Sequence, residues 1–246
     1  MELTHDGILG SRLRIWQPVT GYRVAIDPIF LAASIPAQAG DSILDIGTGV
    51  GAAALCLAKR VPGCYVVGLE LQRDMVRLAA QNVEENGLRE YVEVLYGDLQ
   101  QPPPRLAPST FAHVMANPPF HSSYAGTPSP TVSKQAANAL PHGVIDLKTW
   151  IQFACLMVKP KGTVTFIYPT DHMEDLLLLL HGKVGGLTIY PLWAAENQLA
   201  KRVLIRGVKS AHSPTRLLRG LCLHGEDGRY TAEAEGVLRH AHGVTI

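Results

Sequence analysis

The sequence of 246 residues has no excess of charge of either sign. It carries 22 lysines and arginines against 21 aspartates and glutamates, a formal net charge of +1. So small a net charge cannot draw a whole protein onto nucleic acid, because that attraction needs strong or clustered positive charge. Any contact with RNA or DNA must therefore come from a local basic patch.

Metal-ligand spacings and long apolar runs are missing as well. The four cysteines form no CxxC pair and no histidine lies at the spacing of a zinc ligand, so we expect neither a disulfide framework nor a metal site. The N-terminus lacks the apolar core of a signal peptide, and no apolar run approaches the length of a membrane span. These absences predict a cytoplasmic protein.

The residues that are present favour one large α/β domain. Hydrophobic residues make up 47% of the chain, and from residue 41 short apolar runs alternate with stretches of helical periodicity. This pattern is typical of a mostly parallel sheet with helices on both faces. We expect residues 1–40 to form a hairpin and a helix packed on the main domain, and residues 41–246 to form that domain as a single globular unit. The predicted strands are 42–46, 64–69, 91–96, 111–116 and 163–168, and the predicted helices are 52–60, 73–86, 146–158 and 171–180.

A glycine-rich turn follows the first predicted strand, with the sequence Asp45-Ile46-Gly47-Thr48-Gly49-Val50-Gly51. Glycines let a turn approach a ligand closely, and the helix that begins after it offers free N–H groups. Glu70 ends the second strand and Asp98 follows the third. Three acids therefore lie at or next to the carboxyl ends of successive strands, where open α/β sheets bind ligands.

The spacing of this turn distinguishes between two nucleotide ligands. A dinucleotide site is the natural competitor, but it has the spacing Gly-x-Gly-x-x-Gly, and Asp45 would repel a pyrophosphate. The same carboxylate suits the ammonium group of a methionine moiety. Glu70 is placed to accept hydrogen bonds from a ribose diol, and Asp98 from an adenine amine. A glycine-rich turn beside unrelated surface acids is the remaining alternative.

A second motif, Asn117-Pro118-Pro119-Phe120, follows the fourth predicted strand. The lone pair of an adenine amine or an amide nitrogen is delocalised, which makes that nitrogen a poor nucleophile. The Asn117 side-chain oxygen and the Pro118 carbonyl would accept both amine hydrogens and turn the lone pair towards a methyl donor. The prolines fix φ, and Phe120 offers a flat face for stacking, worth roughly 1–3 kcal/mol for a base. For the tetrapeptide alone, a strand that ends in a Pro-Pro turn is a reasonable alternative.

In this order and spacing, the two motifs with Glu70 and Asp98 resemble the class I amino-methyltransferases. That family includes adenine-N6 methyltransferases of DNA and RNA and the glutamine-N5 methyltransferase of release factors. The resemblance implies a Rossmann-like fold with a seven-stranded, mostly parallel sheet, and S-adenosylmethionine as the methyl donor without a metal. It implies catalytic roles for Asn117, Pro118 and Phe120. The cofactor-binding residues would be Asp45, Gly47, Thr48, Gly49, Gly51, Glu70, Leu71, Asp98, Leu99 and Asn117.

Further segments resemble the valine-tRNA adenine-N6 methyltransferase family. They are Gly21–Asp27, Phe30–Ala33, Lys201–Ile205 and Asp227–Thr231, and the similarity covers almost the whole chain. It implies methylation of an adenine amine beside the anticodon, in a loop where an unpaired base is easily splayed into a pocket. The long loop over residues 121–142 departs from the family. Members often carry Ala-Arg-x-Glu there, whereas this chain has Ala137-Asn138-Ala139-Leu140.

Other functions fit parts of the same pattern. The glutamine methyltransferase of release factors carries a sizeable helical domain ahead of its catalytic domain, for which forty residues leave little room. Many DNA adenine methyltransferases carry a long recognition domain, which is also missing. A cofactor-bound RNA-binding protein without activity is the third alternative, but it would not need an intact Asn117–Phe120 motif.

A basic segment near the C-terminus provides a candidate surface for the expected partner, an RNA such as tRNA. The segment Lys201–Arg219 holds six lysines and arginines and no acid. A solvated basic strand is an equally good alternative. Asp27 borders the cofactor by family resemblance but is also placed to cap a helix. We assign contacts with the substrate or RNA to Pro119, His121, Arg23, Lys201, Arg202 and Arg206.

Overall fold

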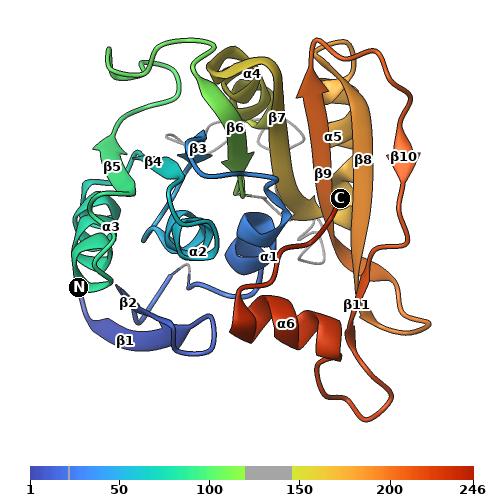
Figure 1. Ribbon diagram of the computed structural model, residues 1–246, viewed down its shortest axis with the longest axis horizontal. Helices are drawn as coiled ribbons and strands as arrows, with labels where there is room; N and C mark the ends of the chain where they lie inside the picture. Colours follow the sequence, from blue (N-terminus) through green and yellow to red (C-terminus); the bar gives the residue numbers. More distant parts are fainter. Residues whose placement is uncertain (22, 120–145) are drawn as a thin grey trace, which may run out of the picture.

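The structure is a computed structural model that describes residues 1–21, 23–119 and 146–246. Within these ranges the strands form one nine-stranded sheet and a separate two-stranded hairpin (Figure 1). Five parallel strands make the centre of the large sheet, in the order β5-β4-β3-β6-β7. They are β3 (Ser42–Ile46), β4 (Tyr65–Glu70), β5 (Val92–Tyr96), β6 (Phe111–Ala116) and β7 (Val158–Pro169).

Beyond β7 the sheet changes direction. Strand β9 (Ala200–Lys209) runs antiparallel to both β7 and β8 (Val184–Ala195), which completes the expected seven strands. Two short strands, β10 (Arg216–Leu217) and β11 (Leu221–His224), pair in parallel with β8 and widen the sheet beyond the prediction. The α/β fold with a mostly parallel sheet is confirmed.

The helices cover both faces of this sheet, as predicted (Figure 1). One apolar core joins α1, α2, α3 and α6 to residues such as Ile43 and Met115. The other joins α4 and α5 to their sequence neighbours Leu44 and Val114, because successive side chains of a strand point to opposite faces. The helices are α1 (Asp27–Ser34), α2 (Ala52–Arg60), α3 (Arg73–Glu85), α4 (Leu147–Met157), α5 (Met173–Leu180) and α6 (Ala232–His240).

Local sequence explains most of the boundaries. Helix α2 spans the residues predicted for it, and α4 begins after Asp146, whose carboxylate accepts a hydrogen bond from the Thr149 amide at 2.8 Å. Strand β7 starts five residues earlier than predicted, because the register with β6 shifts between Phe111 and His113 and lets the Lys159–Gly162 turn stay inside the strand.

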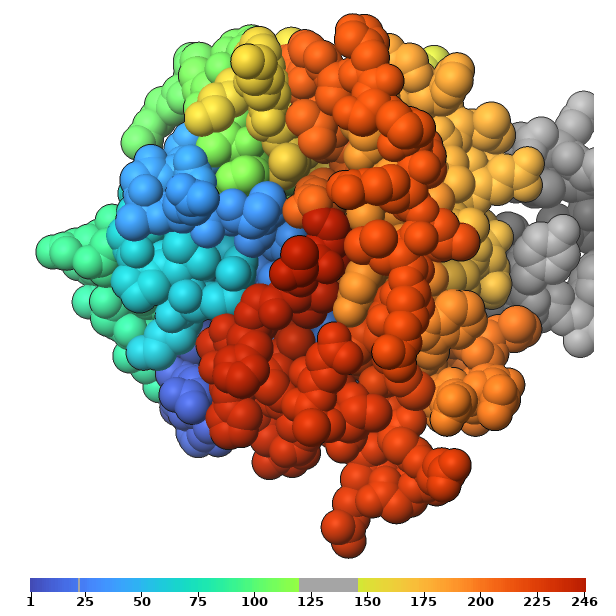
Figure 2. Space-filling view, turned by 45° about the vertical axis from the view of Figure 1, so that its right-hand side comes forward, coloured from blue at the N-terminus to red at the C-terminus, as the bar shows by residue number. Residues whose placement is uncertain are grey.

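The N-terminal hairpin packs on α3, and the C-terminal end of the chain packs on α1. The hairpin of β1 (Leu3–Ile8) and β2 (Leu13–Pro18) precedes α1, and the backbone N–H of Val244 donates to the carbonyl of Ala33 at the end of α1, at 2.8 Å. Figure 2 shows the C-terminal residues, in red, lying against N-terminal residues in blue. No helix in the described ranges is long and apolar enough to cross a membrane.

Candidate active site

A cavity of about 780 Å³ opens at the carboxyl ends of β3, β4 and β6. The strand order reverses between β3 and β6, and open α/β sheets bind ligands in the crevice at such a reversal. The volume lies within the range of roughly 300–1,000 Å³ typical of small-molecule sites. Of the residues predicted to bind the cofactor or the acceptor, the lining includes Asp45, Gly47, Thr48, Gly49, Glu70, Leu71, Leu99, Asn117, Pro118, Pro119 and Arg202.

The glycine-rich turn is held against the end of β4. The backbone N–H groups of Gly47 and Thr48 both donate to the carbonyl of Leu69, at 2.8 and 3.1 Å. Gly47 has φ of +67°, and a Cβ there would collide with the indole of Trp150. Glycine is therefore required at this position both for its backbone conformation and for the close approach of α4.

Asp45 is the most deeply buried acid of the site, with 2% of its surface exposed. The Thr48 hydroxyl donates to its carboxylate at 2.6 Å. Burial raises the pKa of Asp45 to about 7 and the nearby Glu70 adds to the rise, although the Thr48 hydroxyl and the Ala54 amide oppose it. A cation that entered the cavity would favour the ionised form of this carboxylate.

Glu70 is fixed by two backbone amides. Gly49 N–H donates to one carboxylate oxygen at 2.9 Å and Gln72 N–H to the other at 2.8 Å. A carboxylate has about four acceptor positions, so this side chain keeps capacity for a ligand that carries hydroxyl groups. Its bond to Gly49 also ties the end of β4 to the glycine-rich turn.

The Asn117-Pro118-Pro119 motif leaves the end of β6 along the wall of the same cavity. Pro118 is buried, Pro119 is exposed and Asn117 lies between these extremes. The structure thus brings the two predicted motifs, seventy residues apart in sequence, to one cavity. Phe120 and His121, also predicted to contact the acceptor, lie outside the described residues, as does the Ala137–Leu140 stretch.

The end of β5 contributes less directly than predicted. Gly97 and Leu99 line the cavity, but Asp98 is not among its lining residues. The Asp98 carboxylate accepts a hydrogen bond from the Gln100 amide at 2.8 Å and so shapes the turn after β5. Gly51, the last predicted glycine, is the N-cap of α2 with φ of +88° and likewise lies outside the lining.

The residues predicted to contact RNA do not form one surface. Arg202 lines the cavity, and its Nε donates to the Asp27 carboxylate at 2.8 Å. Arg206 is four residues further along β9, about 13 Å by the rise of an extended strand, and is half-buried. Burial lowers the pKa of the Arg206 guanidinium, and the positive charge of Arg216 adds to this. Lys201 is exposed at the cavity end of β9.

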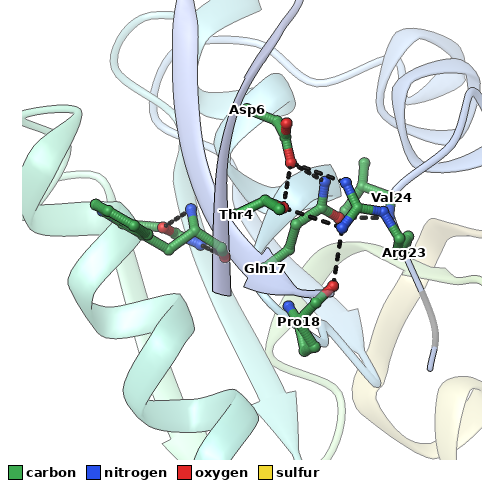
Figure 3. A network of polar contacts seen from close by, with 8 residues as sticks. Thr4, Asp6, Gln17, Pro18, Arg23 and Val24 are labelled. Atoms are coloured by element: carbon green, nitrogen blue, oxygen red, sulfur yellow. Dashed lines mark hydrogen bonds and ion pairs between the residues drawn. The ribbon is translucent and has the colours of Figure 1, made fainter. Parts of the chain in front are cut away.

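Arg23 is bonded to the N-terminal hairpin, although its side chain is partly exposed. Its guanidinium donates to the Asp6 carboxylate, the Thr4 hydroxyl and the Pro18 carbonyl, each at 3.0 Å (Figure 3). Asp27 was expected either to border the cofactor or to cap a helix. It is the first residue of α1 and lines the cavity.

Several lining residues escaped the sequence analysis. Trp150 and Met75 come from helices whose apolar pattern predicted only core packing, and nothing in their spacing marked them as site residues. Pro18 and Thr20 come from the N-terminal segment, which was expected to pack on the domain rather than to line its cavity.

A known family matches the part of the chain that builds most of this cavity. The methyltransferase small domain family matches residues 24–143, which include the glycine-rich turn, Glu70 and the Asn117 motif. A protein of Tolumonas auensis named tRNA1(Val) (adenine(37)-N6)-methyltransferase is 28% identical over 228 residues, which cover 91% of each chain. A protein of Glaesserella parasuis with the same name is 27% identical, over 86% of each chain. The chain is therefore similar to methyltransferases, both in the matched family and in these two relatives.

Solved structures of methyltransferases share the fold of this chain. A predicted O-methyltransferase from Agrobacterium tumefaciens superimposes with a TM-score of 0.73 at 20% identity, over 89% of this chain and 99% of that one. The 16S rRNA N2 G1207 methyltransferase of T. thermophilus, solved with AdoMet and guanosine, superimposes with a TM-score of 0.59 at 20% identity, over 85% and 50%. The expected class I methyltransferase fold is confirmed.

Proposed function

We propose that this methyltransferase acts on tRNA and transfers a methyl group to the exocyclic amine of the adenine beside the anticodon. The observation that carries the proposal is that Asn117, Pro118 and Pro119 share one cavity with Asp45 and Glu70. A cavity with an amine-acceptor motif on one wall and two carboxylates on another suits both partners of an amino-methyl transfer. The shared name of the two relatives supports adenine in valine tRNA as the acceptor.

The residues of the cavity fit the chemistry of S-adenosylmethionine. The buried Asp45 suits its ammonium group, and Glu70 its ribose hydroxyls. A Cβ at Gly49 would meet no atom within 4 Å, so this turn leaves open space beside both acids. Leu71 and Leu99 supply apolar surface for the adenine ring. Asp98 is the least direct of the assigned contacts. It does not line the cavity, and its carboxylate is bonded to the Gln100 amide of the turn after β5.

The methyl group is supplied by the sulfonium of the cofactor, and the protein orients the acceptor. The Asn117 side-chain oxygen and the Pro118 carbonyl accept the two amine hydrogens, so the nitrogen lone pair faces the methyl carbon. With the cofactor bound, the nitrogen held by Asn117 and Pro118 would take the methyl group that the sulfonium gives up and would lose one proton. Catalysis therefore rests on orientation and electrostatics, and no base has to deprotonate the amine first.

For tRNA, the contacts nearest the reaction would come from the cavity end of β9. Lys201 is exposed there, and Arg202 lines the cavity. The half-buried Arg206 and the internally bonded Arg23 are weaker candidates for phosphate contacts than their sequence context suggested. We retain residues 41–246 as the catalytic unit, with residues 1–40 as an extension that contributes to its cavity.

The test uses valine tRNA made by transcription, which carries no modification, and the same transcript with guanine at position 37. We expect incubation with S-adenosylmethionine to give N6-methyladenosine in the first transcript and none in the second, as measured by nucleoside mass spectrometry. Methylation of a release-factor glutamine in place of the tRNA would replace this proposal with the glutamine-N5 alternative.

A further inference from the structure

The N-terminal hairpin forms part of the cavity wall. The cavity is lined by Pro18, which ends β2, and by Thr20, Gly21 and Val24 of the loop that joins β2 to α1. The cofactor site therefore includes chain from outside the parallel sheet.

This loop is closed at its base by a network of polar contacts (Figure 3). The buried Gln17 accepts a hydrogen bond from Val24 N–H at 2.8 Å and donates to the Asp6 carboxylate at 2.8 Å. Arg23 bonds to Asp6 and to the Pro18 carbonyl. The two ends of the loop are thus joined to each other and to β1, so the loop moves with the hairpin.

A single side chain joins this hairpin to the glycine-rich turn. Asn82, in α3, is fully buried, and its oxygen accepts a hydrogen bond from Trp16 N–H in β2 at 2.7 Å. Its amide group donates to the Trp16 carbonyl at 3.0 Å and to the Val50 carbonyl at 2.9 Å. Both amide hydrogens are therefore used, one on each segment. Val50 belongs to the glycine-rich turn and lines the cavity.

We propose that Asn82 is a positioning residue for the cofactor, which holds the glycine-rich turn and the N-terminal hairpin as one unit. Docking of the hairpin and binding of S-adenosylmethionine then strengthen each other, since coupling between two binding events is reciprocal. The reason is the buried Val50 carbonyl: without Asn82 it loses a bond that water cannot readily replace, and the turn relaxes. The inference rests on the cofactor site proposed above.

The chain contains a matched control one helical turn away. Asn86 accepts a hydrogen bond from Arg14 N–H at 2.9 Å and donates to the Arg14 carbonyl at 2.7 Å, so it docks β2 on α3 as Asn82 does. As the C-cap of α3, its side chain also donates to the Asn82 carbonyl at 2.7 Å, and among the described residues it has no bond to the glycine-rich turn. Loss of Asn86 therefore weakens the hairpin alone.

The experiment compares Asn82→Ala with Asn86→Ala in the full chain. We expect Asn82→Ala to raise the Kd and KM for S-adenosylmethionine about tenfold or more, within the range of coupling between sites, and to leave kcat at saturation within about twofold. Asn86→Ala should lower the apo Tm but keep the Kd within about twofold of wild type. An unchanged Kd in Asn82→Ala, or equal rises in both variants, overturns the proposal.

A second measurement needs no variant and covers the case in which Asn82→Ala fails to fold. In the wild-type protein, S-adenosylmethionine should slow hydrogen exchange of residues 13–17, which do not line the cavity, as well as that of residues 47–55. No protection of residues 13–17 overturns the coupling. Binding of S-adenosylmethionine with this protection but without tRNA methylation defeats the proposed acceptor and leaves the inference standing, whereas absence of binding overturns both.

Discussion

The ends of the central strands form two edges of the sheet, a carboxyl edge and an amino edge. The polar groups at these two edges have different partners. At the carboxyl edge, Asp45 and Glu70 accept a few hydrogen bonds from the protein and border an open cavity. Nearer the amino edge, Nδ1 of His113 lies 2.8 Å from the Thr163 hydroxyl, and its Nε2 lies 3.4 Å from the carboxylate of Asp41.

The same contrast extends along β9. At its amino-edge end, the Lys209 ammonium donates to the Val158 carbonyl at 2.7 Å and to the Ser109 hydroxyl at 3.1 Å, whereas Lys201 at the other end is exposed. Groups that bond to one another stabilise the fold, while groups that border a cavity remain available to a ligand. Substitutions at the two edges should therefore separate stability from binding.

The largest effect is expected from Asn117→Ala. Removal of one acceptor that acts in the transition state lowers kcat by about 10²–10³. The affinity for S-adenosylmethionine should stay within about twofold, because the side chain acts on the acceptor amine. Single-turnover methylation of the tRNA transcript measures the rate of methyl transfer, and calorimetry measures the affinity for S-adenosylmethionine. Near wild-type methylation would remove Asn117 from the mechanism.

Next in size are the carboxylates at the cavity. Asp45→Asn and Glu70→Gln should each raise the Kd for S-adenosylmethionine by about 10–100-fold, since each removes a charged hydrogen-bond acceptor. Asp41→Asn is the control at the amino edge and should lower Tm without changing the Kd. Equal Kd values in all three variants would show that the carboxyl edge is no more important for cofactor binding than the amino edge.

The pH dependence of binding should follow Asp45. Its pKa in the folded protein is about 7, above the ordinary value. Protonation of this carboxyl therefore stabilises the folded apo protein, and that contribution to the free energy of unfolding is lost as pH rises through about 7. A cationic ligand favours the ionised form, so affinity should fall by up to about tenfold per pH unit below 7. Calorimetry between pH 5.5 and 7.5 measures this slope, and Asp45→Asn should flatten it. A slope that persists in the variant would assign the titration to another group.

A smaller effect is expected from His113→Gln. Loss of the buried contact with Thr163 should lower stability by about 1–3 kcal/mol at pH 7.5, with no change in cofactor affinity. Burial lowers the pKa of His113 in the folded protein, so its protonation penalises folding as pH falls below the ordinary value of about 6.5. The variant should lose this part of the acid sensitivity in thermal unfolding. A rise in the Kd for S-adenosylmethionine would show that the two edges are not independent.

The smallest effect concerns RNA. Lys201→Gln should weaken tRNA binding a few-fold and reduce the slope of log K against log salt by about 0.7–0.9, the share of one phosphate contact. Lys209→Gln, at the opposite end of β9, should leave the slope unchanged. A titration of binding at several salt concentrations distinguishes the two, and equal slopes would return Lys201 to ordinary surface.

The sequence predicted best where one local rule decides the structure. The apolar strand Ser42–Ile46 and the helix Ala52–Arg60 match the structure, because uniform burial and helical periodicity each leave a clear pattern. Strand β8 and helix α6 were not predicted. β8 carries Gly185, Gly186 and a proline inside a strand, and its pairing with β9 overrides their weak propensity.

For the site, the sequence motifs named residues that the structure places around one cavity, but they did not describe the surroundings of those residues. Asp45, Glu70 and Asn117 are recognisable because their chemistry is tied to spacing within short motifs. The partners of Arg23 could not be predicted, because Thr4 and Asp6 are brought to it only by the hairpin. Asn82 showed no signal at all, since its bonds join segments 32 and 66 residues away.

Asn82 of α3 and Asn86, the C-cap of this helix, also bear on how this protein avoids aggregation. A two-stranded hairpin is marginally stable by itself, and an open strand edge is a template for pairing with another chain. Here the side chains of Asn82 and Asn86 occupy the N–H and carbonyl groups of Trp16 and Arg14, so a helix completes the edge of β2 as a third strand would. The hairpin is therefore not a portable module: transplanted without α3, it would expose the edge that two amide side chains now cover.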